Sequence, residues 1–139
     1  RLLARVRSGE CDVAVGSRFV HGDGYEPHRY KPRPAREDGT RLLRRAMRVA
    51  LGRPFHDATS GMYAVNAKAM PILGKPYDAG APEVESLLRL KDAGLRVEEI
   101  PVDMRERASG ESKLAGKKAA LLVLTVIGTL VAYRRVRKH

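Results

Sequence analysis

The segment from Val97 to Lys113, VEEIPVDMRERASGESK, joins a short apolar run to a turn rich in cations and hydroxyl groups. Its apolar residues predict a strand from Leu95 to Met104. The turn carries cations at Arg105, Arg107 and Lys113, hydroxyls at Ser109 and Ser112, and a flexible position at Gly110. Guanidinium, ammonium and hydroxyl groups together bind anions with several oxygens, such as phosphate or diphosphate. The alternative is a solvated basic turn without a ligand.

A second segment, DVAVGSRFV from Asp12 to Val20, is a strand pattern that ends in Gly-Ser-Arg. Arg18 therefore follows the carboxyl end of the strand, where open α/β sheets bind their ligands. The structural role open to Arg18 is a salt bridge with Asp57 or Glu83.

A third segment, DATSGMYAVNAKAM from Asp57 to Met70, places a carboxylate and two hydroxyls in a turn before a new apolar run. Two interpretations of Asp57 stay open: it contacts substrate, or it caps the turn through the amides of Thr59 or Ser60. Ser60 either donates a hydrogen bond to a phosphate or has a structural role. The spacing of His21, His28 and His56 indicates no metal site, and His56 is interpreted as a loop residue.

The acidic segment PEVE, at residues 82–85, predicts the first turn of a helix, because Pro and Glu are favoured there. Glu83 and Glu85 are two residues apart and do not share a helical face. At most one of them faces a site, and we favour Glu83.

The remaining elements follow from apolar spacing and from Gly, Pro and capping residues. A long, charged and proline-rich loop is expected from His21 to Asp38. The other predictions are a helix over Leu2–Arg7 ended by Ser8-Gly9, a strand over Val13–Val15 buried on both faces as in a parallel sheet, an extended link over Gly61–Val65, a helix over Lys68–Leu73 capped by Asn66, and a helix from Pro82 that ends at Gly94.

A helix from Arg41 to Leu51, with Thr40 as its N-cap and Gly52 as its stop, is expected to be amphipathic. One face carries Leu42, Leu43, Ala46, Met47 and Ala50, and the other carries Arg41, Arg44, Arg45 and Arg48. We expect this helix to pack on the core and to lie at an anionic membrane surface.

The last predicted helix runs from Leu114 to Arg137 and is flanked by basic residues. Its 15 uncharged residues, 119–133, span about 22 Å, less than the roughly 30 Å hydrocarbon core of a bilayer. An interfacial helix is the first interpretation, a short membrane span the second and a buried helix the third.

The amino-acid composition limits the classes of binding partner that the chain is expected to have. The net charge of +11 over 139 residues and the pI near 10.3 favour an anionic partner: nucleic acid, an acidic membrane or a phosphorylated substrate. The chain has two Phe, five Tyr and no Trp, so nucleic-acid binding by base stacking is poorly supported. The single cysteine, Cys11, excludes an internal disulfide and is expected in the core.

The motifs VGSR, DATSG, PEVE and EEIPVDMRERASGESK occur in the order seen in family-2 glycosyltransferases. The chain most closely resembles the dolichyl- or polyprenyl-phosphate sugar transferase branch, from Cys11 to about Tyr133. The usual Gly- and Asn-containing acceptor stretch after GSR is replaced here by a Pro- and Arg-rich segment. No Asp-x-Asp, which holds metal and donor diphosphate in that family, occurs in the sequence. The resemblance thus implies the C-terminal part of a longer enzyme, inactive alone, with the Mg²⁺ or Mn²⁺ ligands mostly in a missing N-terminal half.

The resemblance also assigns roles. It makes Asp57 the catalytic carboxylate, as a general base or as a group that orients the acceptor. Groups for substrate or phosphate binding would be Arg18, Ser60, Glu83, Arg107, Ser112 and Lys113. No metal ligand is assigned within this chain.

The expected fold is α/β: residues 1–113 form the C-terminal part of a GT-A-like catalytic domain, and residues 114–139 a hydrophobic, membrane-associated helix. The expected function is sugar transfer from a nucleotide-sugar to a polyprenyl- or dolichyl-phosphate acceptor. It would take place at the cytoplasmic face of the cell membrane, with a peripheral or monotopic attachment and no nucleic acid as partner. The alternatives are a non-catalytic membrane-binding fragment and, less favoured, a basic nucleic-acid-binding protein.

Overall fold

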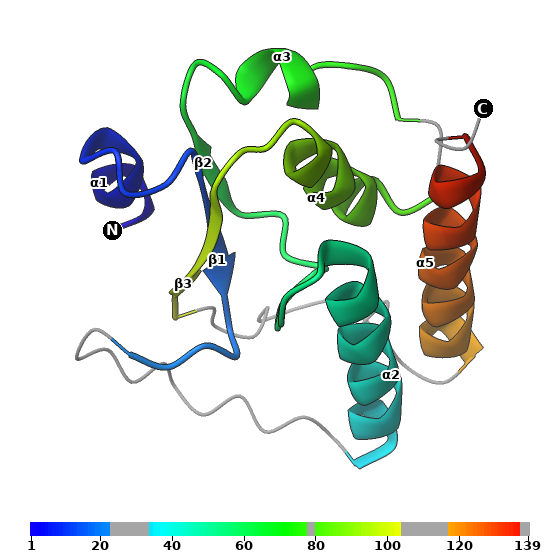
Figure 1. Cartoon of the computed structure of the whole chain (residues 1–139). Coiled ribbons are helices and arrows are strands. Elements are labelled where there is room, and N and C mark those ends of the chain that lie inside the picture. Colours follow the sequence, from blue (N-terminus) through cyan, green and yellow to red (C-terminus); the bar gives the residue numbers. More distant parts are fainter. Residues whose placement is uncertain (23–33, 78–79, 104–116, 137–139) are drawn as a thin grey trace.

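The computed structural model describes residues 1–22, 34–77, 80–103 and 117–136, which form a small α/β domain (Figure 1). Three strands build one mixed sheet in the order β2-β1-β3. The strands are β1 (Val13–Ser17), β2 (Tyr63–Val65) and β3 (Val97–Pro101). The helices are α1 (Leu2–Arg7), α2 (Pro34–Leu51), α3 (Met70–Leu73), α4 (Pro82–Asp92) and α5 (Lys117–Val136).

The sheet is only partly parallel. β1 runs parallel to β3, with Val13 opposite Val97 and Ser17 opposite Pro101. β2 pairs with the other edge of β1 in the antiparallel direction, with Val15 opposite Tyr63. The expected parallel environment of β1 is therefore correct on one edge and wrong on the other. All five residues of β1 are buried, because helices cover both faces of this central strand.

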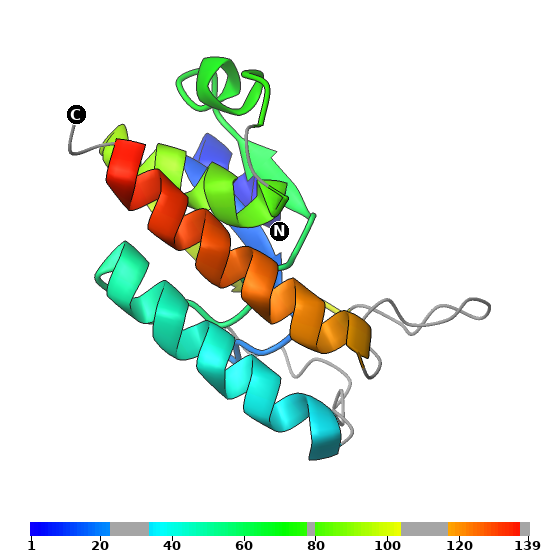
Figure 2. The same ribbon diagram turned by 90° about the vertical axis from the view of Figure 1, so that its right-hand side faces the viewer.

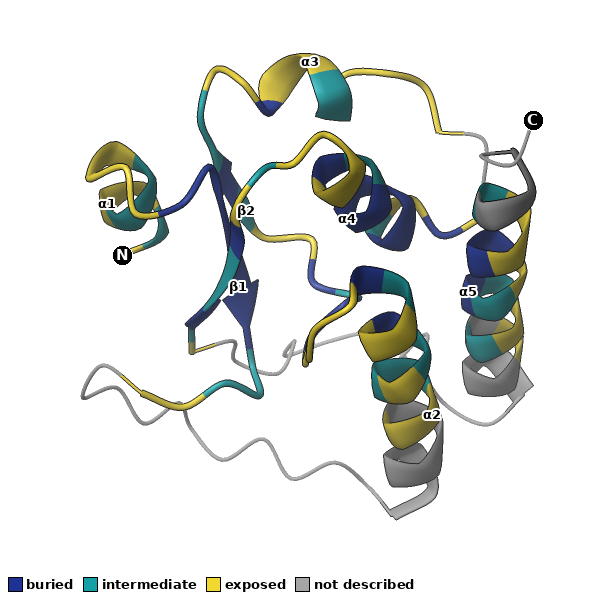
Figure 3. Ribbon diagram, in the orientation of Figure 1, coloured by how far each residue is buried: buried dark blue, intermediate teal, exposed yellow. Residues whose placement is uncertain are grey.

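Helices α2, α4 and α5 cover one face of the sheet, and α1 covers the other (Figures 1 and 2). The larger core joins Val13 and Val15 of β1 to Met47 of α2, Leu87 of α4 and Val126 of α5. The smaller core lies under α1 and is built from Cys11, Ala14, Ala64 and Ile100. Burial is concentrated in the sheet and in the helix faces turned towards it (Figure 3). Cys11 is a core residue as expected, and burial raises the pKa of its thiol.

Helix α2 begins at Pro34, so Thr40 is not its N-cap and the expected loop to Asp38 is too long. Proline fits the first turn of a helix because its missing N–H has no partner there in any case. Gly52 ends the helix as predicted, with φ of 72°. Met47 is fully buried, but Leu42 is 48% exposed, so its assignment to the core-facing side is corrected.

Helix α5 packs one face into the domain. Val126, Thr129 and Leu130 are buried, whereas Leu121 and Leu124 are about two-thirds exposed. Within the described residues, no helix combines the length and apolar character that crossing a membrane requires. α5 lies at Lys117–Val136, close to the predicted helix from Leu114 to Arg137, and it packs one face into the domain while the other face stays exposed.

The other elements lie close to their predicted positions. α4 begins at Pro82, and Gly94 follows its C-cap with φ of 70°. Asn66 Oδ1 accepts hydrogen bonds from the amides of Lys68 and Ala69, in a turn that precedes α3 rather than at the N-cap of α3. The described part of β3 ends at Pro101, before the predicted Met104.

Substituting Ala for two glycines is expected to change stability in opposite directions. At Gly94, φ is +70° and no atom lies within 4 Å of the position that an added Cβ would take, so Gly94→Ala meets backbone strain alone. Gly94→Ala should therefore lower the free energy of unfolding by about 1 kcal/mol. Gly128 lies inside α5 with open space around it, so Gly128→Ala should stabilise the protein by roughly 0.5–1 kcal/mol. Urea unfolding of both variants measures this, and equal signs would contradict it.

Asp12 joins the starts of β1 and β3 and makes stability pH-dependent. Its carboxylate accepts hydrogen bonds from the Arg96 amide at 2.9 Å, the Arg96 guanidinium at 3.3 Å and the Asn66 amide at 2.8 Å. The Arg96 amide contributes most to holding the pKa of Asp12 below its usual value. This stabilisation is therefore present above the ordinary carboxyl pKa and is lost as the pH falls through the lowered one.

We expect Asp12→Asn to be less stable than the wild type at pH 7, with a difference that vanishes at the acid end of a urea-midpoint series from pH 7 to pH 2. A difference that is constant across the series would contradict the linkage.

Candidate functional site at the carboxyl end of β1

Arg18 and Asp57 form a two-point ion pair where β1 ends. Arg18 Nε donates to Asp57 Oδ2 at 2.8 Å, and its Nη2 donates to Oδ1 at 2.7 Å. The Arg18 amide also donates to Oδ2, at 3.1 Å. The Asp57 side chain is fully buried, and that of Arg18 is 22% exposed. The two predicted residues are therefore in contact, and they form the Arg18–Asp57 salt bridge expected as the structural role of Arg18. Their contact with substrate stays a prediction.

Glu99 of β3 holds the loop that carries Asp57. Its Oε1 accepts from the amides of Asp57 at 2.8 Å and His56 at 3.0 Å. Its Oε2 accepts from the His56 amide at 2.9 Å and contacts His56 Nδ1 at 2.9 Å. A carboxylate that accepts several N–H donors fixes the backbone that carries them. Glu99 therefore sets the position of Asp57 from a neighbouring strand.

The turn after Asp57 is closed by its own hydrogen bonds. The Ser60 amide donates to the Asp57 carbonyl at 3.1 Å, and Ser60 Oγ accepts from the Met62 amide at 3.3 Å. Ser60 is 3% exposed. This is the structural role that the sequence left open for Ser60, and phosphate binding by its hydroxyl stays a prediction.

Two arginines and an aromatic ring lie beside the ion pair. The Arg18 guanidinium is 5.4 Å, and that of Arg44 4.7 Å, from the centroid of the Phe19 ring. Arg44 Nε also donates to the His56 carbonyl at 3.3 Å. Arg44 was expected on the exposed arginine face of α2. It instead contacts Phe19 and the loop before Asp57, where it adds positive charge.

Tyr63 and Glu83 lie near the same cluster. The Tyr63 hydroxyl is the buried side-chain group without a hydrogen-bond partner among the described residues. Burial, followed by the charges of Glu83 and Asp57, raises its pKa, so the hydroxyl stays protonated at neutral pH. Glu83 is half-buried, and its predicted role in a site stays a prediction. Glu85 is buried and pairs with Arg89 on α4.

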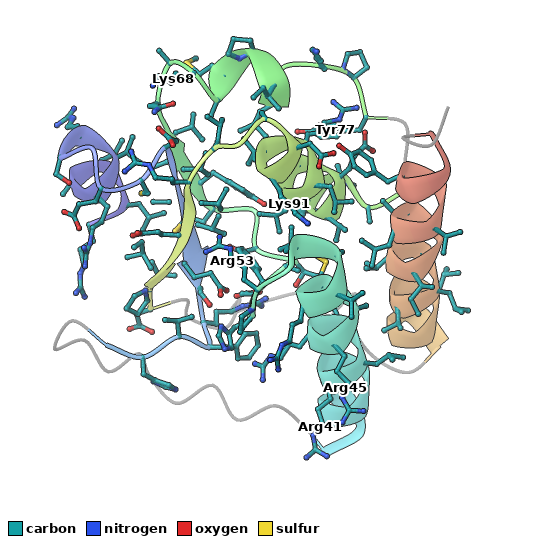
Figure 4. All side chains as sticks on the ribbon, viewed as in Figure 1. Arg41, Arg45, Arg53, Lys68, Tyr77 and Lys91 are labelled. Carbon is teal, nitrogen blue, oxygen red and sulfur yellow. The ribbon has the colours of Figure 1, made fainter. Side chains whose placement is uncertain are left out.

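A cavity of about 460 Å³ lies elsewhere, between the C-terminal ends of α2 and α4 and the start of β3. Phe55 is the residue of its lining closest in sequence to Asp57. Its three cations contact main-chain carbonyls: Arg53 reaches Val97, Lys91 reaches Ala50 and Arg96 reaches Gly9 (Arg53 and Lys91 are labelled in Figure 4). The cavity is thus separate from the Arg18–Asp57 pair, at the opposite end of the parallel strands.

Three predicted site residues, Arg107, Ser112 and Lys113, lie outside the described residues. Within the described ranges, no group of three or more His, Cys, Asp or Glu side chains is placed to hold a metal ion.

Sequence comparison finds a distant, partial homologue of this chain. The glycosyltransferase AglD of the archaeon Haloferax volcanii is 32% identical over 116 residues, which cover 81% of this chain. The chain spans only 17% of the length of AglD. No family model matches the chain, and no solved structure matches it. The chain is therefore related to glycosyltransferases, and the family-2 assignment is not confirmed by a family model.

Sequence reasoning missed Glu99, Arg44 and the role of His56. A signal for Glu99 was present: side chains alternate along a strand, so Glu99 shares a face with Val97, which contacts the main core. A carboxylate on the core side of a strand needs hydrogen-bond donors, and the loop before Asp57 supplies them. His56 and Arg44 carried no comparable signal.

Proposed function

We propose that this chain is part of a glycosyltransferase that moves a sugar from a nucleotide-sugar to a polyprenyl- or dolichyl-phosphate acceptor. The observation that carries the proposal is the Arg18–Asp57 pair. It joins the Gly-Ser-Arg end of β1 to the Asp-Ala-Thr-Ser-Gly turn, and the relationship to AglD supports the reaction class. The GT-A-like fold, of which this chain would be the C-terminal part, belongs to the same proposal.

In this reaction the described residues would orient groups and stabilise charge, and none of them needs to abstract a proton. Sugar transfer passes through an oxocarbenium-like transition state, and a phosphate acceptor is already anionic at neutral pH. Asp57 is buried against Arg18, so we assign it the orientation of Arg18 and of the turn rather than proton abstraction. Arg18 and Arg44 would stabilise negative charge on the phosphate oxygens. Arg107, Ser112 and Lys113 would bind the donor diphosphate, together with Mg²⁺ or Mn²⁺ bound elsewhere in a longer protein.

Attachment to the cytoplasmic face of a membrane is part of the proposal. α2 and α5 lie side by side (Figures 1 and 2). Both expose large apolar side chains, at Leu42, Val49, Leu121, Leu124 and Val131. Exposed arginines follow along α2 (Arg41 and Arg45 are labelled in Figure 4), and each cation near an anionic surface contributes roughly 1 kcal/mol. A peripheral or monotopic attachment fits these side chains.

The test is transfer of labelled sugar by the longer protein that contains this chain. A panel of nucleotide-sugars would be offered with polyprenyl phosphate, with the matching polyprenol as the control acceptor, in the presence of Mg²⁺ or Mn²⁺. The proposal expects product with the phosphate and none with the alcohol. Product with neither acceptor, from folded protein, would contradict it.

A non-catalytic membrane-binding module is the second candidate, favoured by the exposed apolar residues of α2 and α5. Binding to anionic vesicles that is weakened in Leu121→Ser/Leu124→Ser, without any transfer by the longer protein, would favour it. Salt-dependent binding to duplex DNA without vesicle binding would favour a nucleic-acid-binding protein instead.

A further inference from the structure

A histidine–carboxylate pair beside the Arg18–Asp57 pair has no part in the chemistry described above. His56 Nδ1 lies 2.9 Å from Glu99 Oε2, where the carboxylate is 8% exposed and the His56 side chain 44% exposed. A carboxylate only accepts hydrogen bonds, so Nδ1 carries the proton. In the neutral ring the lone pair is then on Nε2, which has no hydrogen-bond partner among the described residues.

The charges around His56 come from four places. Arg44 of α2 donates to the His56 carbonyl, and Arg18 at the end of β1 pairs with the neighbouring Asp57. Glu99 faces the ring from β3, and Asp57 is the next residue of the loop. Both carboxylates are largely buried and accept several hydrogen bonds each, whereas the His56 ring is half-exposed. The cluster around His56 therefore combines the positive charge of Arg18 and Arg44 with one proton-accepting nitrogen on a partly exposed ring.

We propose that His56 binds a phosphate monoester and takes its remaining proton, with Glu99 as the positioning residue. This deepens the proposed function, on which it rests, by naming the group that recognises the acceptor. In this step the O–H bond of the monoester monoanion breaks and its electron pair stays on the phosphate oxygen. The proton bonds to Nε2, which gives a phosphate dianion beside an imidazolium.

The second pKa of a phosphate ester is about 6, so a monoester gives up its remaining proton near neutral pH. Glu99 stabilises the imidazolium through Nδ1, and Arg44, which donates to the His56 carbonyl, adds positive charge to the same cluster. The acceptor would thus be held in its more nucleophilic form.

The test measures ligand binding to the 139-residue chain by NMR, with ¹⁵N-labelled imidazole rings and ³¹P detection. Geranyl phosphate is the probe, and its methyl diester is the matched control because it is anionic but has no proton to give near pH 7. Inorganic phosphate shows whether the lipid chain contributes. His21→Gln is the control variant, since His21 is an exposed histidine that belongs to neither the Arg18–Asp57 pair nor the His56–Glu99 pair.

We expect geranyl phosphate to protonate Nε2 of His56 and to bind about tenfold more weakly at pH 8.5 than at pH 6.5. His56→Gln should weaken binding at pH 6.5 by about tenfold, the effect of one charge-assisted hydrogen bond, and should flatten the pH profile. The diester should bind the wild type without this pH dependence. Glu99→Gln should shift the ¹⁵N signals of His56 away from the Nδ1–H tautomer. His21→Gln should behave as the wild type.

Equal binding of monoester and diester by the wild type would overturn the inference, without reliance on any variant. So would unchanged affinity and pH profile in folded His56→Gln. If the longer protein transfers sugar at the same rate with and without His56→Gln, the inference is wrong and the proposed function is unaffected. Binding through His56 without any transfer would defeat the proposed function and leave the inference standing.

Discussion

Asp57→Ala is expected to lower the free energy of unfolding by about 3–5 kcal/mol, because it leaves a mostly buried guanidinium without its carboxylate. The Asp57 side chain is fully buried, and it accepts from two guanidinium nitrogens and one amide of Arg18. Its removal would take away the carboxylate that binds two guanidinium nitrogens of Arg18. Urea unfolding of the variant and the wild type at pH 7 measures the difference.

The matched control is Glu10→Gln, which removes the carboxylate from an exposed pair with Arg5. Those two side chains are 47% and 33% exposed, so the loss should stay below about 1 kcal/mol. The double variant Arg18→Met/Asp57→Leu should recover part of the Asp57→Ala loss, since no buried charge is left unpaired. Similar small losses in Asp57→Ala and Glu10→Gln would show that the Arg18–Asp57 pair does not hold the site together.

The second large effect is expected for Phe55→Ala, at about 3–5 kcal/mol. Phe55 is 2% exposed, belongs to the main core and lines the cavity of about 460 Å³. It also begins the short loop that leads to His56 and Asp57. Loss of its ring would remove apolar contacts and enlarge the cavity that Phe55 lines. Thermal and urea unfolding would both measure the resulting loss of stability.

Leu124→Ala is the control for Phe55→Ala. Leu124 is 65% exposed on α5, and alanine is favourable in a helix, so its loss should be under about 0.5 kcal/mol. A loss below about 1 kcal/mol for Phe55→Ala would mean that the ring does not support the loop as the core suggests.

Local signals predicted most of the elements. The apolar run around Val13 indicated a buried strand, and Pro82 and Gly94 marked the ends of α4 because their backbone preferences are strong. The antiparallel place of β2 was not predictable, since it depends on pairing between segments about 50 residues apart. The prediction of Thr40 as the N-cap of α2 was wrong. Threonine is typical of N-caps but also occurs inside helices, and Thr40 lies within α2.

The candidate site was predictable only in part. Motif order brought Arg18 and Asp57 into consideration, and the structure places them in contact. The hydrogen bonds of Glu99 to the amides of His56 and Asp57 join residues 42 and 43 positions apart, and no short-range pattern encodes such a contact. The buried face of α5 was not predictable, because the sequence does not show that α2 and α4 pack against it.

The central claim is tested most directly by Arg18→Lys in the longer protein, assayed for sugar transfer to polyprenyl phosphate. Lysine keeps the positive charge but loses the planar, two-point geometry with Asp57 and with phosphate. We expect the folded fraction to change little and kcat/KM to fall by roughly 100-fold, or about 3 kcal/mol of transition-state stabilisation. Unchanged kcat/KM in well-folded Arg18→Lys would contradict the placement of the site at the carboxyl end of β1.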